Sequence, residues 1–278
     1  MANYKVFCVA DKKYEDCALI ALKSYFEHNT HPVTLYAFDD LDKTRFSGLK
    51  RLTIEPIKTF EIPKYESFKD YWATIDKISA KIRIFDSLIG EYEYACCFDL
   101  DSIFLGNVDE LFVPQKYDLM GVEEYWGNTA TFRGYPYFNA GFLIYKLNQP
   151  LFEHYLEFLK NWWICFPEQD FLSTFIKSRG SLPIKYNFLP SHHHLSDDIR
   201  FIHYAMPYKP FRCVPVWLQT FLNKIQPILF SMDAYWKYVK KNKIDLTGDF
   251  YKNCERANKN LQIIRLIQQR KQNEQSNI

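Results

Sequence analysis

Two acidic residues at the end of an apolar run are the part of this sequence best suited to chemistry. Residues 94–105 read Tyr-Ala-Cys-Cys-Phe-Asp-Leu-Asp-Ser-Ile-Phe-Leu, which is typical of a buried strand, and they contain Asp99 and Asp101. In an extended backbone, side chains two residues apart point to the same side, so both carboxylates can face one cation. A hard divalent metal would offset the cost of burying these acids and leave positions for phosphate oxygens. The alternative is a solvated strand end that is merely acidic.

Strands and amphipathic helices alternate in the half of the chain that leads to this acid pair. We expect strands at 5–10, 32–38 and 51–57, and helices at 14–28 and 75–89. This order predicts an α/β fold with a mainly parallel, Rossmann-like sheet flanked by helices. Such sheets bind ligands beyond the carboxyl ends of their strands, where Asp11, Asp39 and Asp40 also fall. A dinucleotide-dependent enzyme is disfavoured because the GxGxxG fingerprint is missing from the sequence.

The second half of the chain is less regular. We expect a strand at 137–147, helices at 151–163 and 168–177, a short strand at 199–205, and helices at 217–241 and 251–272. The sequence contains no internal repeat or low-complexity linker. The predicted organisation is a catalytic domain over 1–215, followed by a helical C-terminal extension over 216–278 that packs on the same domain and ends in a frayed tail.

The composition narrows the possible functions. A formal net charge of +2 gives no electrostatic reason to expect nucleic acid as a partner. The seven cysteines include no CxxC pair, and their odd number argues against a complete disulfide framework. No window reaches the roughly 20 apolar residues of a transmembrane helix, and the N-terminal apolar run is too short for a signal peptide. We therefore expect a cytoplasmic protein; a homodimer is left open.

Five further short segments follow the acid pair in order along the chain. They are Asn-Val-Asp-Glu-Leu-Phe at 107–112, Tyr-Phe-Asn-Ala-Gly-Phe at 137–142, Glu-Gln-Asp-Phe-Leu-Ser at 168–173, Leu182-Pro183 with Tyr186-Asn187, and a block from His203 to Phe211. In this order, over roughly residues 5–211, the series resembles glycosyltransferase family 8, which includes glycogenins and bacterial lipopolysaccharide glycosyltransferases. The resemblance implies a GT-A fold, a UDP-sugar donor, a divalent metal and transfer with retention of anomeric configuration.

The resemblance assigns residues to the metal and the diphosphate. Asp99, Asp101 and His203 match the family's metal ligands, and an imidazole beside two carboxylates favours Mn²⁺, with Mg²⁺ as the alternative. The alternative for His203 is a hydrogen-bonded core histidine. Lys209 matches the lysine that contacts the diphosphate and neutralises the departing nucleotide, although most lysines are simply surface residues. Met206 stands where the family usually has glycine, which puts the phosphate-loop geometry in question.

The donor nucleotide and the transferred sugar are assigned in the same way. Tyr14 matches a residue that stacks on the base, although it also fits the buried face of the first helix. Lys81 matches a basic residue that contacts the donor, and Arg83, two residues later, is the alternative for that role. The full expected donor-binding set is Val9, Ala10, Asp11, Tyr14, Lys81, Asp99, Leu100, Asp101, Asn139, Ala140, Glu168, Gln169, His203, Met206 and Lys209.

The catalytic residues implied by the resemblance are Asn139, Gln169, Asp170 and Lys209. Asn139 and either Gln169 or Asp170 match positions that face the sugar, whose hydroxyls need paired donors and acceptors. The alternative for 168–170 is a helix N-terminus, where acids are favoured. Because Gln169 is a poor nucleophile, attack from the leaving-group face is favoured over a double displacement.

The acceptor side departs from glycogenins. The segment 188–202 contains no tyrosine, so the self-glucosylated tyrosine of that group has no counterpart there, and His192, His193 and His194 are interpreted as solvated residues. We expect UDP-glucose as the donor and a separate sugar or glycan as the acceptor. The alternatives are a UDP-galactose-dependent transferase of the lipopolysaccharide type and a catalytically inactive binding homologue. An aspartate-nucleophile phosphatase is disfavoured because its acid pair normally ends the first strand.

Overall fold

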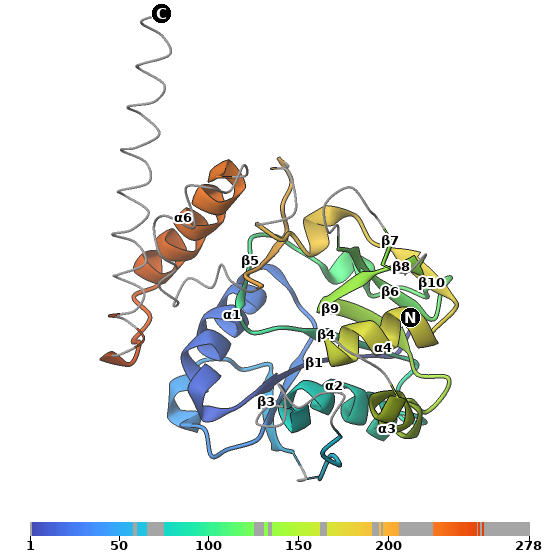
Figure 1. Ribbon diagram of the computed structural model, residues 1–278. Coiled ribbons are helices and arrows are strands. Elements are labelled where there is room, and N and C mark those ends of the chain that lie inside the picture. The colour runs from blue at the N-terminus through green and yellow to red at the C-terminus, as the bar shows by residue number, and fades with distance from the viewer. Residues whose placement is uncertain are drawn as a thin grey trace, which may run out of the picture.

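A seven-stranded sheet forms the centre of the molecule, and helices flank both of its faces (Figure 1). The computed structural model describes residues 2–57, 60–65, 75–124, 131–132, 135–161, 166–190, 195, 197–205, 225–248, 250 and 252. The strands of the central sheet are β1 (Tyr4–Ala10), β2 (Val33–Ala37), β3 (Leu52–Pro56), β4 (Tyr94–Phe98), β6 (Leu119–Glu123), β9 (Phe138–Lys146) and β10 (Arg179–Ser181). The helices are α1 (Glu15–His28), α2 (Ile75–Ser87), α3 (Phe152–Asn161), α4 (Pro167–Phe175) and α6 (Ile225–Lys241). Short 3₁₀ turns occupy Lys12–Tyr14, Lys43–Phe46, Asp109–Leu111 and Ile184–Tyr186.

The sheet is mainly parallel, as the sequence predicts, but one inner strand is reversed. The spatial order is β10-β6-β9-β4-β1-β2-β3, and β9 runs antiparallel to both β4 and β6. The other neighbouring pairs are parallel. The chain reaches β9 from β6 through the small hairpin of β7 (Thr131–Phe132) and β8 (Tyr135–Pro136), and antiparallel neighbours, unlike parallel ones, can be joined without a crossover helix. The antiparallel strand is therefore a local exception within the predicted α/β sheet.

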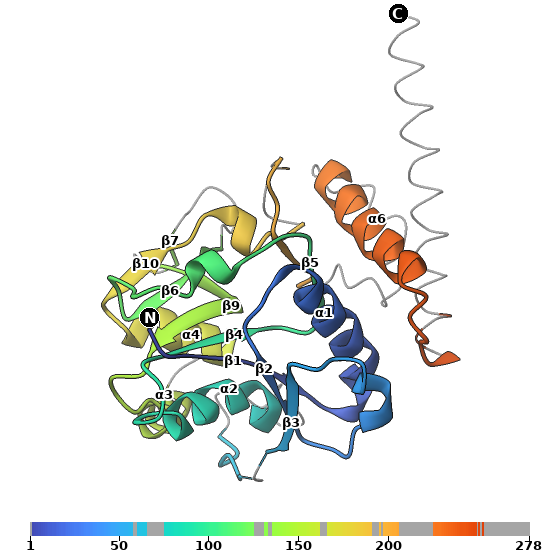
Figure 2. The ribbon, with the colours of Figure 1, turned by 180° about the vertical axis from the view of Figure 1, so that it is seen from behind.

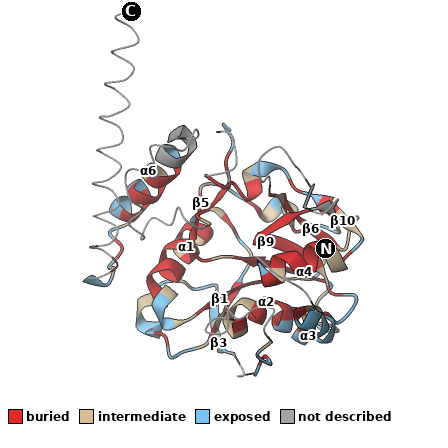
Figure 3. Cartoon of the chain, viewed as in Figure 1, coloured by how far each residue is buried: buried red, intermediate tan, exposed pale blue. Residues whose placement is uncertain are grey.

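Side chains alternate along the central strands and divide the interior into two cores. Along β1, Val6, Cys8 and Ala10 belong to the core that contains α1, whereas Phe7 belongs to the core that contains α2, α3 and α4. Strands β4 and β9, inside the sheet, are almost wholly buried, and Figure 3 shows them in red. This burial on both faces explains why β1 and β4 read as nearly continuous apolar runs in the sequence.

A separate two-stranded ribbon places a distant segment beside the acid pair. It consists of β5 (Ser102–Phe104) and β11 (Phe201–His203), which pair antiparallel with Ser102 opposite His203. The buried strand expected to end at the acid pair is confirmed as β4, but the acids do not lie in extended backbone, because the chain bends at residues 99–101 before β5. In this bend, the Ser102 hydroxyl donates to the Asp99 carbonyl at 2.5 Å, and the Tyr204 N–H donates to the Asp101 carbonyl at 2.8 Å. The acid pair thus lies in a turn that β11 braces.

The other expected elements match closely where they can be compared. The strands expected at 5–10, 32–38, 51–57 and 137–147, and the helix expected at 75–89, are confirmed within two residues at each end. The helix expected at 14–28 starts with a 3₁₀ turn, which Asp11 caps by accepting from the Tyr14 N–H. The expected residues 217–224, and nearly all of the helix expected at 251–272, lie outside the described residues.

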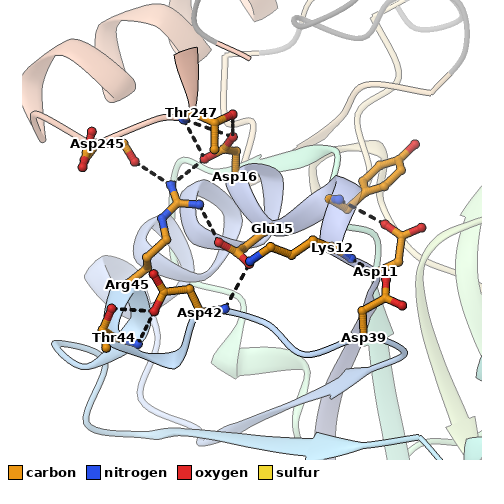
Figure 4. A network of polar contacts seen from close by, with 11 residues as sticks. Asp11, Lys12, Glu15, Asp16, Asp39, Asp42, Thr44, Arg45, Asp245 and Thr247 are labelled. Carbon is orange, nitrogen blue, oxygen red and sulfur yellow. Dashed lines mark hydrogen bonds and ion pairs between the residues drawn. The ribbon is translucent and has the colours of Figure 1, made fainter. Parts of the chain in front are cut away.

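Helix α6 packs beside α1, away from α2–α4, in both views of the ribbon (Figures 1 and 2). The Tyr238 hydroxyl donates to Glu27 Oε1 of α1 at 3.1 Å, and the Tyr204 hydroxyl donates to the Ser231 carbonyl at 2.6 Å. The segment after α6 joins the same region through a polar network around Arg45 (Figure 4). The domain boundary expected at 215/216 stays a prediction, because it falls outside the described residues.

Candidate metal and donor site

Three side chains that can ligate a metal converge where the sheet meets the β5–β11 ribbon. Asp99, Asp101 and His203 each offer one ligand atom, and these atoms lie within 4.8 Å of one another. His203 Nε2 lies 3.4 Å from Asp99 Oδ2 and 3.5 Å from Asp101 Oδ1. Asp101 and His203 are buried, whereas Asp99 is half-buried. Neighbouring ligands of an octahedral cation with bonds of about 2.1 Å lie about 3 Å apart, so this set fits a divalent cation after small movements.

Lys81 binds the other oxygen of Asp99. Its Nζ lies 2.5 Å from Asp99 Oδ1 and donates to the Ala140 carbonyl at 2.9 Å. Burial alone would lower the lysine pKa, but neighbouring groups, led by the Asp99 carboxylate and including Glu168, together outweigh burial and raise the pKa above its ordinary value. Asp99 therefore uses Oδ1 for a fixed positive charge and directs Oδ2 toward the imidazole.

A second cluster, formed by buried polar groups, adjoins the ligands. Gln169 Nε2 donates to Glu124 Oε2 at 2.5 Å, and Asn139 Nδ2 donates to the same oxygen at 3.1 Å. The Ala140 N–H donates to Gln169 Oε1 at 2.9 Å. Glu124 is not among the residues expected from the sequence, because we did not predict the strand β6 that precedes it. Its only sequence signal is a pair of acids that follows the short apolar run 119–122.

Asp170 holds the start of α4. Its two oxygens accept from the Tyr137 hydroxyl at 2.7 Å and from the Phe166 N–H at 3.2 Å, and the residue is 1% exposed. These contacts fit the helix-terminus alternative for this segment. Glu168 is half-buried, less than Asp170. Its burial still raises its pKa to about 7, although Lys81 opposes that shift.

Helix α2 links the expected nucleotide-binding residues to the acid pair. Asp11 accepts from the Tyr14 N–H and lies 2.5 Å from Lys77 Nζ, one helical turn before Lys81. Lys77 is not among the residues expected from the sequence, although its four-residue spacing from Lys81 places both on one face of a helix. Tyr14 is half-buried and packs against the core of α1, while Val9 and Ala10 end β1.

The remaining expected residues divide between two groups. Leu100 is buried in the bend between β4 and β5, and Arg83 is exposed on α2, where its guanidinium lies over the Phe152 ring. Met206, Lys209 and the three histidines at 192–194 lie outside the described residues. Their expected roles stay predictions.

The comparisons with known proteins identify the fold. No protein-family model matches the chain, and no curated protein matches it. The solved galactosyltransferase LgtC, in complex with donor and acceptor sugar analogues, is 13% identical, with a TM-score of 0.64 over 90% of this chain and 99% of that one. The glycosyltransferase GlyE of Streptococcus pneumoniae TIGR4 is 17% identical, with a TM-score of 0.57 over 87% of this chain and 65% of that one. Mouse xyloside xylosyltransferase 1 is 12% identical, with a TM-score of 0.54 over 76% of this chain and 99% of that one.

The chain has a GT-A fold. In this GT-A chain, the cluster of Asp99, Asp101 and His203 lies just beyond the carboxyl end of β4. Open α/β sheets bind their ligands at such strand ends. Among the described residues, no helix is long and apolar enough to cross a membrane.

Proposed function

We propose that this protein is a metal-dependent glycosyltransferase that moves a hexose from a UDP-sugar to a sugar or glycan acceptor with retention of configuration. The observation that carries the proposal is the convergence of Asp99, Asp101 and His203 beyond the carboxyl end of β4. The GT-A fold supports the same reaction class, because the solved proteins that share it include glycosyltransferases for galactose and xylose. The family 8 resemblance in the sequence supports the UDP-sugar and the retaining stereochemistry.

The metal site has a defined task in this reaction. Asp99, Asp101 and His203 would hold Mn²⁺, with Mg²⁺ as the alternative, and the cation would supply positive charge to the donor diphosphate. Lys81, and Lys209 by its sequence match, add fixed positive charge near the leaving group. A role of this kind is electrostatic, and it needs no strong base.

The sugar-side residues favour attack from the leaving-group face. Both ends of the Gln169 amide are engaged, because Nε2 donates to Glu124 and Oε1 accepts from the Ala140 N–H. An amide held in this way is a poor covalent nucleophile. A solved structure of LgtC carries a Gln→Glu substitution in its active site, so an active-site glutamine has a precedent in a protein with this fold.

The donor hexose has two candidates. Glucose follows from the likeness of the chain to a glycogenin catalytic domain, whereas the fold similarity to a galactosyltransferase favours galactose. A nucleotide-release assay with UDP-glucose and UDP-galactose, each with Mn²⁺ and simple sugar acceptors, tests the proposal. We expect release from one donor in Mn²⁺ and none in chelator.

Matched variants make this assay specific. Asp101→Ala removes a proposed metal ligand and should abolish nucleotide release. Asp118→Ala is the control and should retain wild-type activity, because Asp118 precedes the start of β6, whereas the site lies beyond the carboxyl ends of the strands. Full activity in chelator would sink the metal assignment. No release from either donor with Mn²⁺ would favour the inactive binding homologue.

A further inference from the structure

The side-chain oxygen of Asn139 lies within hydrogen-bonding distance of three nitrogen atoms, one of which belongs to a proposed metal ligand. Asn139 Oδ1 lies 2.8 Å from the Gly141 N–H donor, 2.9 Å from Asn187 Nδ2 and 2.9 Å from His203 Nδ1. Asn139 is 4% exposed and His203 is 5% exposed. The contact therefore lies inside the protein, where a wrongly paired polar group is costly.

Chemistry fixes which way the Asn139 amide points. The Gly141 backbone N–H can only donate, so the atom that it contacts must be the amide oxygen. At the other end, Asn139 Nδ2 contacts Glu124 Oε2 at 3.1 Å, and an ionised carboxylate can only accept. Both ends of the amide require the same orientation, so His203 Nδ1 faces an acceptor and must carry a proton.

The consequence concerns the other nitrogen of the imidazole. A neutral ring with a proton on Nδ1 has its lone pair on Nε2. His203 Nε2 is the atom that lies 3.4 Å from Asp99 Oδ2 and 3.5 Å from Asp101 Oδ1. Three electron-rich atoms then face one another, which is favourable only around a cation.

Gly141 permits this contact by leaving room for the ring. A Cβ atom at position 141 would lie 2.0 Å from His203 Nδ1, 2.4 Å from Cε1 and 2.7 Å from Asn139 Oδ1. Any side chain at this position would push the imidazole away from Asn139. The Asn-Ala-Gly sequence at 139–141 thus supplies both the acceptor for the ring and the space that the ring occupies.

We propose that Asn139 is a positioning residue that holds His203 in the Nδ1–H tautomer and directs its Nε2 lone pair at the metal. This inference rests on the metal site of the proposed function. The sequence-based expectation that Asn139 also faces the transferred sugar stays a prediction; both ends of its amide contact protein groups in this structure.

The first test measures the wild-type chain. In the metal-free wild-type chain, at a pH where the ring is neutral, long-range ¹H–¹⁵N correlation spectra report which nitrogen carries the proton, and His203→Gln assigns the signal. We expect a protonated Nδ1 and an unprotonated Nε2. A proton on Nε2 would overturn the inference, and this result does not depend on whether the protein is an enzyme.

The second test measures Mn²⁺ binding by electron paramagnetic resonance of the free ion, without donor. Asn139→Ala should weaken binding about 10- to 100-fold, the usual effect of removing a group that orients a metal ligand. Asn161→Ala is the matched control, since it removes an exposed amide at the end of α3 that contacts Glu157, and it should bind Mn²⁺ like wild type.

The outcomes separate the inference from the proposed function. Equal Mn²⁺ affinity in wild type and in folded Asn139→Ala would refute the role of Asn139 and leave the metal site standing. If the wild-type chain binds no Mn²⁺, the metal assignment fails, and the tautomer measurement still decides how Asn139 holds the ring. If Asn139→Ala does not fold, the wild-type spectra decide the question alone.

Discussion

Two of the proposed metal ligands, Asp99 and His203, each use one polar atom for the protein and direct another at the site. Asp99 binds Lys81 through Oδ1 and presents Oδ2, and His203 binds Asn139 through Nδ1 and presents Nε2. Such outer contacts fix the orientation of ligands before the metal arrives. The residues that support the ligands should therefore affect activity as strongly as some residues that contact the donor.

Lys81 and Arg83 lie on the same helix, and the sequence alone leaves open which one serves the donor. Lys81→Met should lower turnover at least tenfold, because it removes the fixed charge beside Asp99, whereas Arg83→Met should stay close to wild type since Arg83 lies over Phe152. Steady-state nucleotide release measures both variants. The reverse ranking would assign the donor contact to Arg83.

Gln169 should affect the chemical step more than nucleotide binding. Gln169→Ala removes an amide that Glu124 and the Ala140 N–H hold in place, so we expect kcat to fall about 100-fold through loss of sugar positioning. The affinity for UDP, measured by calorimetry, should change little. An equal loss of UDP affinity would mean that this segment lies beside the nucleotide and not beside the sugar.

At the scale of elements, the sequence predicts what periodicity encodes and misses what depends on pairing between distant segments. The helices and most central strands follow from apolar spacing. Strand β6 escaped prediction, and with it Glu124, because five residues of mixed character carry too little pattern. The pairing of Ser102 with His203 cannot be read from the sequence, since no local signal specifies the partner of a three-residue strand.

The same limit applies to the acid pair. The sequence predicts convergence from an extended strand, but the carboxylates meet His203 in a bend between β4 and β5. The ligand residues could be expected from their types and sequence matches. Their actual arrangement depends on the β5–β11 ribbon, which brings His203 beside the acid pair. Contacts such as the one between Asn139 and His203 depend on positions within about 3 Å, which spacing does not specify.

The network at the start of α1 makes a prediction about stability (Figure 4). Arg45 binds Glu15 Oε1 at 2.8 Å, Asp16 Oδ1 at 2.5 Å and the Asp245 carbonyl at 2.6 Å, and so joins α1 to the segment after α6. Arg45→Ala should lower the free energy of unfolding by about 1–2 kcal/mol, between the values typical of exposed and buried ion pairs. Chemical denaturation measures this change. Lys160→Ala, which breaks an exposed ion pair with Glu157, is the control and should have no measurable effect.

This network should also give a pH dependence of known sign. Burial alone would raise the pKa of Glu15, but hydrogen bonds from Lys12, Arg45 and the Asp42 N–H outweigh burial and lower it. The ionised form is therefore favoured in the folded state, so its stabilisation is present above the ordinary value near 4.5 and is lost as the pH falls below it. Glu15→Gln should show a flatter loss of stability between about pH 5 and pH 3 in thermal melts. If Glu15→Gln loses stability with falling pH as steeply as wild type, other carboxylates dominate the acid dependence of stability.

At the scale of the whole molecule, the C-terminal segment is anchored next to the proposed metal ligands. Tyr204 directly follows His203; its N–H donates to the Asp101 carbonyl and its hydroxyl donates to the Ser231 carbonyl of α6. Asp16 adds a contact from α1 to Thr247 beyond α6, at 2.6 Å between Oδ2 and Oγ1. The C-terminal helix is thus coupled to the site through one buried tyrosine, and it is not a separate appendage.

The positions of the tyrosines in the molecule bear on whether the protein can accept the hexose itself. Self-glucosylation requires a tyrosine hydroxyl that can reach the donor, but the segment 188–202 contains no tyrosine. Tyr204 is fully buried with its hydroxyl bound to Ser231, Tyr137 is bound to Asp170, and Tyr208 lies outside the described residues. We predict that the protein transfers its hexose to a separate sugar, glycan or, slowly, water. Intact-mass spectrometry after incubation with Mn²⁺ and UDP-glucose or UDP-galactose should show an unchanged mass while UDP is released, with a chelator-treated sample as the control. A ladder of added hexoses that maps to a tyrosine would refute the prediction and restore a self-acceptor.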